Sequence, residues 1–571
     1  MKKTLLLLVA FCTSLFAGAQ VWTGSINTDW NEAGNWSTNA VPSASGDVTI
    51  PGSLVNYPVL SSAITINSID IQNGSLIDFG SGGSLFINTN SNKYSFFKGA
   101  TINGSGGSIN LQIKGRVNYQ VVMGGCTITA DMVLTLTGQT DFKEGHGTPN
   151  TFQHNLEVII SSSEPYWSSY DAASQFLGNY SVTRTVGGLL DIFNVGGYVA
   201  GDFSLSNLIG NGAVRIGSSN EAQATLISGR FFVDADYHAL PNVFEIQRVK
   251  NLTPGGRVIG KNTYGLNLRN DTLIVDTIGI FGTRGNNYST IYDNHFTGVT
   301  HLEDSITAPG SYGTFIRNNR FDGNFRIKRN GAATFYEADV ASLPNYYNGE
   351  FTYIQDGTGG ALVSKLSSST FKGSVSFEFN NTGGGDLFGS GVNIDGDFSY
   401  TQTSTGDNYI GTVNKATNIG GKVDISINNS NGGRFHVHRL INQTLGGSIS
   451  ASGVHGFEFL NDTLIVNDVD IKQRAGTAYG RFFNNKLTGN LTIETDVNNS
   501  NYPTTIRSSE IIGNATFKHN DISNFDVADL ANTSVSITGN VSIVGASKSS
   551  VFTLGNLSPV TIGGNLGISM A

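Results

Sequence analysis

The chain has 571 residues, of which 72 are glycine and only 11 are proline, and 13% of its residues are charged. It is rich in Asn, Thr, Ser, Ile, Val and Phe, which favour strands and tight turns, so the composition predicts an all-β protein and excludes a helical bundle or an ordinary α/β enzyme. The formal net charge of −9 argues against binding to nucleic acid or to anionic lipid surfaces, because both repel an acidic protein.

Residues 1–19 have the pattern of a secretory signal peptide. Lys2 and Lys3 form a basic start, an apolar run follows at 5–11, and Ala17-Gly18-Ala19 is typical of a cleavage site. This apolar run is too short to cross a bilayer, and no later run reaches the ~20 apolar residues required. We therefore expect a secreted or cell-surface protein whose mature chain does not insert into a membrane. One of the two cysteines lies in this segment, so the mature chain can form no intramolecular disulfide.

The mature chain opens with a tryptophan-rich stretch, which we assign to an N-terminal capping module over 20–60. Trp22, Trp30 and Trp36 are predicted to form its small core rather than a binding surface.

A repeated pattern occupies most of the rest: an apolar residue, any residue, Gly, any residue, apolar, any, apolar. In "GNLTI" (489–493) the alternation puts Leu491 and Ile493 on one face of a strand. A glycine just before a strand suits either a positive φ or a close approach of two backbones. One such unit cannot bury its apolar face, whereas stacked units form a continuous core, so 61–571 is predicted to be a parallel β-solenoid with rungs of about 25 residues. The glycines that carry the pattern are Gly188, Gly201, Gly229, Gly298, Gly323, Gly349, Gly373, Gly396, Gly421, Gly447, Gly489, Gly513, Gly539 and Gly564.

A longer repeat lies on top of this period. Residues 248–304 align without gaps on 439–495, and both contain Asn-Asp-Thr-Leu-Ile-Val. After a one-residue deletion the match continues, which defines duplicated blocks 248–341 and 439–531. Both blocks contain a 42-residue step between glycines, so we expect one irregular rung that was copied with the rest.

An aromatic segment over 164–171, "EPYWSSYD", lacks the rung pattern and is predicted to be a loop that leaves the coil. Tyr166, Trp167 and Tyr170 are the candidate ligand-binding residues, because exposed aromatic rings stack on sugars. The alternative is that they pack the loop against the solenoid.

Two histidines, His436 and His438, alternate with apolar residues and should leave the same outward face of a strand, a geometry that can hold a metal. No third ligand is identifiable in the sequence nearby. We therefore interpret them as surface histidines and expect no metal and no cofactor.

A catalytic alternative needs acids on neighbouring coils to hold calcium and a basic residue to abstract a proton. Asp395, Asp397 and Asp424 lie near the glycine column, and Arg326 and Lys328 lie a few coils earlier. Solvated turn positions explain these residues equally well, so we expect no catalytic residues.

Asparagines directly follow several of the glycines, and stacked coils would align them into ladders along one sheet, with ordinary solvation as their role. These are Asn324, Asn490, Asn514, Asn540 and Asn565.

The segments "IYDNHFTG" (291–298), "IRNNRFDGNFRI" (316–327) and "FFNNKLTGNLTI" (482–493) resemble rungs of the right-handed parallel β-helix proteins of the pectin-lyase-like superfamily. The start, 21–51, resembles the opening module of autotransporter passengers and type IX secretion cargo. The residues that carry this second resemblance are Trp22, Gly24, Asp29, Trp30, Asn35, Trp36, Pro42, Asp47, Val48 and Ile50. Together the resemblances imply a right-handed parallel β-helix with an N-terminal β cap on a bacterial surface protein.

These resemblances imply fold more than function, since such proteins include adhesins, surface-layer components and polysaccharide-degrading enzymes. We expect a non-catalytic adhesin or glycan-binding protein whose partners are extracellular glycans or cell-surface components. The alternatives are a polysaccharide lyase or glycoside hydrolase, and a structural surface-layer or matrix component. Type IX cargo would carry a C-terminal sorting domain, whereas this chain stops within a rung-like segment at 560–571, so we expect a truncated C-terminal end.

Overall fold

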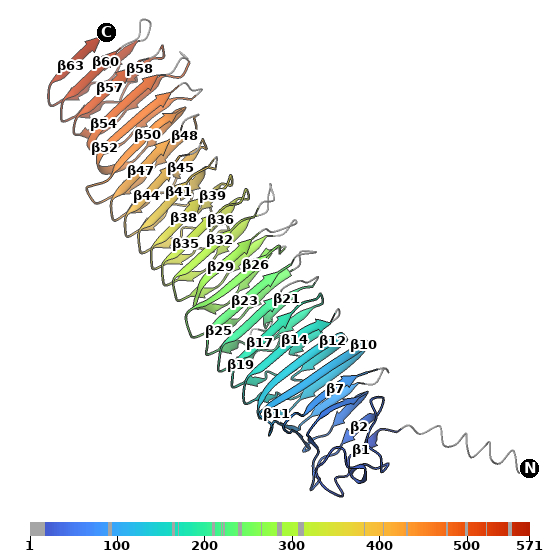
Figure 1. Ribbon diagram of the computed structural model, residues 1–571. Coiled ribbons are helices and arrows are strands. Elements are labelled where there is room, and N and C mark those ends of the chain that lie inside the picture. Colours follow the sequence, from blue (N-terminus) through green and yellow to red (C-terminus); the bar gives the residue numbers. More distant parts are fainter. Residues whose placement is uncertain are drawn as a thin grey trace, which may run out of the picture. The chain divides into compact units, whose positions relative to one another are not determined.

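The computed structural model describes two compact units, Met1–Val258 and Ile259–Ala571, which are treated separately below (Figure 1). It describes residues 18–570 apart from 90–93, 163–165, 170, 208–211, 219, 221–222, 238–242, 264, 282–287, 307–312, 382, 404, 430–431, 475–477, 497–500, 521 and 546–550. Most of the predicted signal peptide therefore lies outside the described residues. Within the described part of the chain, no helix is both long enough and apolar enough to span a bilayer.

Each unit consists of short strands arranged on three faces, and a strand pairs with the strand one rung further along the chain. Every described pairing between two named strands is parallel, as in the run from β35 (Phe325–Arg329) through β38 (Phe351–Gln355) to β41 (Val375–Phe379). The rungs have about 24 residues and make about 20 turns, so the prediction of an all-β parallel solenoid is confirmed. Parallel pairing in a solenoid is local in sequence, since each strand meets its neighbour after one short circuit.

The strands of the first unit fall on the three faces as follows. Face 1 holds β4 (Ala63–Ile66), β7 (Ser84–Asn88), β10 (Ser108–Gly124), β12 (Asp131–Glu144), β14 (Leu156–Ser162), β17 (Tyr180–Arg184), β20 (Phe203–Asn207) and β23 (Phe231–Asp236). Face 2 holds β1 (Gln20–Val21), β2 (Asp47–Ile50), β5 (Ser68–Ile71), β8 (Ser95–Lys98), the second halves of β10 and β12, β15 (Tyr166–Ser169), β18 (Leu190–Ile192), β21 (Val214–Gly217) and β24 (Val243–Gln247). Face 3 holds β3 (Val59–Leu60), β6 (Leu76–Phe79), β9 (Thr101–Asn103), β11 (Thr127–Ile128), β13 (Thr151–Phe152), β16 (Gln175–Phe176), β19 (Gly197–Val199), β22 (Thr225–Ile227) and β25 (Val249–Asn251).

The second unit has the same three faces, and β26 (Gly256–Lys261) contains the boundary between the units. Face 1 holds β29 (Val275–Phe281), β32 (Thr300–Asp304), β35, β38, β41, β44 (Phe398–Gln402), β47 (Val423–Asn428), β50 (Ser448–Val454), β52 (Thr463–Arg474), β54 (Lys486–Asp496), β57 (Ala515–His519), β60 (Val541–Gly545) and β63 (Leu566–Met570). Face 2 holds β27 (Gly265–Arg269), β30 (Ser289–Tyr292), β33 (Thr314–Arg317), β36 (Phe335–Glu337), β39 (Ala361–Val363), β42 (Gly385–Leu387), β45 (Asn408–Gly411), β48 (Arg434–His438), β51 (Gly456–Leu460), β53 (Gly480–Phe483), β55 (Thr504–Arg507), β58 (Phe525–Val527) and β61 (Phe552–Leu554). Face 3 holds β28 (Thr272–Leu273), β31 (His295–Phe296), β34 (Arg320–Phe321), β37 (Tyr346–Tyr347), β40 (Thr370–Phe371), β43 (Asn393–Ile394), β46 (Thr417–Ile419), β49 (Leu440–Asn442), the first halves of β52 and β54, β56 (Glu510–Ile512), β59 (Val535–Ile537) and β62 (Val560–Ile562).

The N-terminal stretch folds around its three tryptophans. Trp22, Trp30 and Trp36 are buried, and the ring of Trp36 meets the other two edge-on at centroid distances of 5.0 and 4.8 Å. The predicted aromatic core is therefore confirmed. A single 3-10 turn, η1 (Ala33–Asn35), lies within this stretch. The boundary at residue 60 stays a prediction, although β2 already pairs with β5 of the solenoid.

The glycines of the repeated pattern, which stack from rung to rung as the glycine column, are explained by close packing of successive backbones. A Cβ added to Gly323 would lie 2.5 Å from the carbonyl oxygen of Gly298, and one added to Gly539 would lie 2.5 Å from that of Gly513. Neither glycine has a positive φ, so of the two explanations left open by the sequence, close approach is the correct one at these positions. The Gly539 amide also donates to the Gly513 carbonyl at 2.9 Å, which ties each rung to the previous one.

The predicted asparagine ladder is present beside this column. The side-chain oxygens of Asn490, Asn514 and Asn540 accept from the backbone amides of Asn514, Asn540 and Asn565 at 3.1, 2.9 and 2.9 Å. Each bond joins neighbouring rungs, so the ladder satisfies exposed backbone groups at the turn.

The interior of the second unit combines stacked aromatic rings with a buried asparagine ladder. Phe296, Phe321 and Tyr347 on face 3 stack with centroid distances of 5.0 Å. Nearby, the backbone amide of Asn294 donates to Asn319 Oδ1 at 3.0 Å, and that of Asn319 donates onward to the next rung. Identical side chains recur because each rung repeats the same backbone geometry.

The expectation of one irregular 42-residue rung is wrong. Between Gly447 and Gly489 the chain makes two short rungs, because Ser448 pairs with Asp468 and Asp468 pairs with Asn490. Asn467 stands where the middle glycine would be, and its amide donates to the Gly447 carbonyl at 3.0 Å. The pattern search missed this rung because its leading residue is not glycine.

Candidate functional site

One outward column of side chains runs along face 2 of the second unit. Residues in this column pair directly from strand to strand, and they alternate with buried residues on each strand; on β48, for example, His436 lies between the buried Phe435 and Val437. We call this set the outer column, and its members are partly exposed except for Thr505, which is buried. The outer column consists of Asn267, Thr290, Phe315, Tyr336, Leu362, Asp386, Tyr409, His436, Glu458, Arg481, Thr505, Asp526 and Thr553.

Aromatic rings occupy one part of the outer column. The rings of Phe315 and Tyr336 stack almost parallel at 4.5 Å, and Tyr288 meets Phe315 edge-on at 5.0 Å. The guanidinium of Arg317 lies 4.6 Å from the centre of the Phe315 ring. Partly exposed aromatic rings next to a cation offer both an apolar surface and hydrogen-bond donors.

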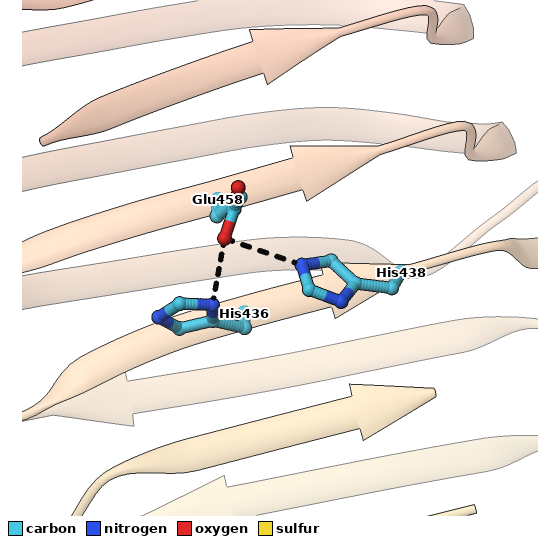
Figure 2. A group of neighbouring side chains, drawn as sticks. All are labelled: His436, His438 and Glu458. Carbon is cyan, nitrogen blue, oxygen red and sulfur yellow. Dashed lines mark ion pairs between the residues drawn. The ribbon is translucent and has the colours of Figure 1, made fainter. Parts of the chain in front are cut away.

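Further along, two histidines and a glutamate meet (Figure 2). His436 and His438 leave the same face of β48, and Glu458 extends from the neighbouring β51 toward both imidazoles. Glu458 Oε2 lies 3.0 Å from His436 Nδ1 and 3.5 Å from His438 Nε2. The three side chains are 13 to 17% exposed, so they are largely shielded from solvent.

The other oxygen of the Glu458 carboxylate faces the next strand. Arg481 on β53 donates from Nη1 to Glu458 Oε1 at 3.3 Å, and its guanidinium lies 4.8 Å from the centre of the Tyr479 ring. The tyrosine is 44% exposed. Arg481 thus fixes the carboxylate while its own outer edge stays accessible.

These side chains line a hollow of about 310 Å³ on the outward face. The lining residues are Arg434, His436, Gly456, Phe457, Glu458, Ala478, Tyr479 and Arg481. In the described part of the chain, the Arg434 guanidinium has no ion-pair partner. The hollow therefore holds one carboxylate against two guanidinium groups and a histidine, a local excess of positive charge on an acidic protein.

The charge state of Glu458 follows from these neighbours. His436 and then His438 hold the pKa of the Glu458 carboxyl well below its usual range, with Arg481 adding to the effect, whereas partial burial acts in the opposite direction. The carboxylate is therefore ionised at any physiological pH. It can act as a ligand or a hydrogen-bond acceptor, and it is unsuited to donate a proton as a general acid.

The acids proposed for a catalytic calcium site have separate structural roles. Asp395 pairs with Lys372 at 2.8 Å in an exposed ion pair. Asp397 and Asp424 accept from backbone amides of the following rung, at 2.8 and 2.9 Å. Among the described residues, the group of three potential metal ligands that comes together is His436, His438 and Glu458.

The two basic residues of that hypothesis lie on β35. Arg326 is exposed, and Lys328 Nζ lies 3.6 Å from Asp356 Oδ2. Neither of them lines the hollow.

The aromatic segment of the first unit is not a loop where it is described. Residues 166–169 form β15, which pairs in parallel with β12 and β18 and is therefore part of a rung. The rung pattern marks face 1 strands that follow a glycine, such as β35 after Gly323, whereas β15 lies on face 2. Tyr170 lies outside the described residues. A ligand-binding role for Tyr166, Trp167 and Tyr170 stays a prediction.

A second hollow, of about 570 Å³, lies over five rungs at the turns beside face 3. Asn, Ser and Thr predominate in its lining. Of its three ionisable residues, Lys486 and Glu510 pair with each other at 3.2 Å, and Asp462 is buried. It lacks both an aromatic ring and an unpaired guanidinium, so the hollow around Glu458 has the stronger recognition chemistry.

Sequence reasoning identified His436 and His438 and missed Glu458, Tyr479 and Arg481. The available signal was the match of "RFHVH" (434–438) to "GFEFL" (456–460), which places His436 opposite Glu458. Reading that match requires the local register of 22 residues rather than the mean period.

Comparison with known proteins is informative only at the N-terminus. A family described as "Domain of unknown function (DUF8693)" matches residues 21–103, which comprise the tryptophan-rich stretch and the first rungs. No curated protein matches the chain. No solved structure matches it either.

Proposed function

We propose that this protein is a secreted or cell-surface β-solenoid that binds acidic glycans without turning them over. The observation that carries the proposal is that the outer column places stacked aromatic rings and the hollow around Glu458 on one outward face. Aromatic faces stack on the apolar side of sugar rings, and guanidinium groups bind carboxylates through paired hydrogen bonds.

The form of the site favours a linear, acidic ligand. Successive members of the outer column are one strand apart, about 4.8 Å, so a sugar chain lying along the column would meet one side chain after another. Arg434 and Arg481 supply the positive charge at the hollow, and Phe315 with Tyr336 supplies the apolar surface. We therefore assign uronate-containing polysaccharides as the ligand class.

The single carboxylate of the hollow supports binding over hydrolysis. Glycoside hydrolysis ordinarily uses two carboxyl groups, one as acid and one as base or nucleophile. In the described lining, Glu458 is the one carboxylate, and it is held by two histidines and an arginine. A lyase or hydrolase is the competing function, and a structural surface-layer component is the third.

The test is calorimetric titration of the full mature chain with polygalacturonate, with dextran as the neutral control and chelator in all buffers. We expect binding to polygalacturonate alone. Arg434→Val should weaken it roughly tenfold by removing a charge-assisted contact, and Phe315→Thr roughly fivefold by removing a stacking surface. Thr505 is the residue that stands opposite Phe315 in the other copy of the repeat, and Val243 stands 191 residues before Arg434, just before the blocks begin.

Three results would overturn the proposal. Cleavage of polygalacturonate during the titration would make the protein an enzyme. Equal affinity in both variants would place the binding face elsewhere. Self-assembly of the pure protein with no affinity for any glycan would favour the structural role.

Export is tested separately. The proposal expects the protein in the culture medium or on the cell surface, with a mature N-terminus at Gln20. Recovery of the chain from the cytoplasm with residues 1–19 intact would contradict it.

A further inference from the structure

We propose that His436, His438 and Glu458 form a zinc site, a function separate from glycan binding. Each side chain offers one donor atom, and the three atoms lie within 4.8 Å of one another. Figure 2 shows the carboxylate of Glu458 directed between the two imidazoles.

The separations of the donor atoms fit a metal between them. Zinc binds nitrogen and oxygen ligands at about 2.0–2.2 Å, which puts neighbouring ligands of a tetrahedral ion about 3.3–3.5 Å apart. The Glu458 Oε2 atom is 3.0 Å from His436 Nδ1 and 3.5 Å from His438 Nε2. A shift of His436 by a few tenths of an ångström brings its separation from Glu458 into this range, and the two imidazole nitrogens lie within 4.8 Å of each other.

The scaffold already holds the ligands in position. His436 and His438 are two residues apart on β48, so the pleat of the strand directs them to one side, and strand pairing sets Glu458 opposite His436. Arg481 holds the second oxygen of the carboxylate at 3.3 Å, as outer contacts do for metal-binding carboxylates.

One buried atom makes the case beyond simple ion pairing. His438 Nε2 is buried and makes no hydrogen bond to any described residue. Its contact there is the 3.5 Å ion pair with Glu458 Oε2. A buried polar atom without a hydrogen bond is costly, and a metal ion would give this nitrogen a direct bond.

The donor set selects the class of metal. Two imidazoles with one carboxylate suit zinc and related first-row ions, whereas calcium and magnesium require a shell of oxygen atoms. Three protein ligands also leave a fourth position open to water or to an external carboxylate.

The other copy of the repeat lacks this set. Asn267 stands where the second copy has Glu458, and at the same offset of 191 residues, just before the blocks begin, Glu245 and Gln247 stand for His436 and His438. The same rung geometry is thus compatible with residues that do not bind zinc. Glutamine at the position of His438 is therefore a replacement that the fold should tolerate.

The test is titration of tag-free, chelator-treated mature protein with zinc chloride by calorimetry, without any glycan. We expect one equivalent of zinc per chain, and at least about tenfold weaker binding in His438→Gln, since changes even to outer contacts of a zinc site cost about 10–100-fold. Cobalt titration should give the intense visible absorption of tetrahedral Co²⁺, lost in the same variant. His438→Gln should keep the circular dichroism spectrum and melting temperature of the chelator-treated parent.

The matched control is His295→Gln. His295 Nε2 also contacts a carboxylate, Asp322 Oδ2 at 2.5 Å, without belonging to a group of three ligands. It should leave zinc binding unchanged. No binding by the parent protein, equal affinity in His438→Gln, or loss of binding in His295→Gln would each overturn the site. Glycan binding is measured in chelator, so either proposal can fail without the other.

Discussion

The two copies of the duplicated block fill the same interior position with different chemistry. In the first copy, Asp304 and Arg329 form an ion pair with no solvent exposure, at 3.0 Å. In the second copy the corresponding residues are Thr495 and His519, whose side chains meet at 3.1 Å. The rung therefore keeps a pair of polar side chains in contact at this position and does not specify which pair.

The outward face differs between the copies as well. The second copy has Glu458 and Arg481 in the outer column, where the first has Asn267 and Thr290, and the first has Phe315 where the second has Thr505. Buried apolar positions are constrained by stacking on both neighbours, whereas outward positions meet water and can change freely. Recognition chemistry diverged on this face while the coil was retained.

The largest effect is expected from breaking the interior ion pair of the first copy. Arg329→Met leaves the Asp304 carboxylate buried without its cation, with hydrogen bonds only from the Ile306 amide and the Thr314 hydroxyl, and should lower the free energy of unfolding by about 3–5 kcal/mol. The double change Asp304→Thr with Arg329→His installs the pair of the second copy and should lose less than half of that. Urea unfolding followed by circular dichroism measures both, and equal losses would contradict the comparison.

The leading glycines of the two copies should also respond unequally. Gly489 has φ +141°, and a Cβ there would lie 2.1 Å from the Val466 carbonyl oxygen, whereas at Gly298 the nearest atom is an Ile274 methyl at 3.2 Å. Gly489→Ala should cost about 1–3 kcal/mol and Gly298→Ala under about 0.5 kcal/mol, because a methyl group can move aside and a backbone carbonyl cannot. Thermal unfolding of the two variants gives the ratio of their stability losses. A larger loss for Gly298→Ala than for Gly489→Ala would contradict the argument from the Val466 carbonyl.

A buried acid gives a pH-dependent difference. Burial raises the pKa of Asp462 well above its ordinary value, although amides of Leu440 and Leu460 act against this, and its Oδ2 has no hydrogen-bond partner among the described residues. The folded state therefore keeps a proton that the unfolded chain releases, so stability falls as the pH rises above the ordinary pKa of aspartate. Asp462→Asn should add about 1 kcal/mol at pH 7 and nothing at pH 3.

The corresponding acid of the first copy is the control. Asp271 Oδ2 accepts from the Arg269 amide at 3.0 Å, so Asp271→Asn should gain less at neutral pH. Urea unfolding of both variants from pH 3 to pH 8 provides the measurement. If Asp462→Asn and Asp271→Asn raised the free energy of unfolding equally at every pH, the missing hydrogen bond at Asp462 would make no contribution to stability.

The smallest effect belongs to an ion pair that both copies share. Arg317 contacts Asp339, and Arg507 contacts Asp529, each through two hydrogen bonds of 2.7 to 2.9 Å. Because the arginines are partly exposed, Arg317→Ala and Arg507→Ala should each cost under about 1 kcal/mol, equally, and less in high salt. A difference beyond experimental error in urea midpoints would mean that the copies differ here too.

The fold was predictable because a solenoid repeats one local solution. Alternating apolar residues after a glycine, as at 489–493, specify a strand, its buried face and the contact with the previous rung together. Prediction failed at Asn467, where a rung begins without glycine, because the backbone there meets the same geometric demand with another residue. It failed at β15 because the pattern marks strands of face 1, whereas β15 lies on face 2.

The candidate site was half predictable. His436 and His438 are two residues apart, so one strand already places them together. Glu458 joins them only through pairing between rungs, and turn lengths vary: 27 residues separate Tyr409 from His436, whereas 22 separate His436 from Glu458. Counting the mean period of about 25 residues from His436 therefore leads to a position beyond Glu458. Turns vary in length between rungs while the strands keep their places.

The most direct test of the binding face is a crystal structure of the mature chain with a galacturonate hexasaccharide. We predict the sugar along the outer column, with a ring on Phe315 and Tyr336 or a carboxylate at Arg434 and Arg481. Sugar bound on another face, or at the ends of the solenoid alone, would contradict the assignment.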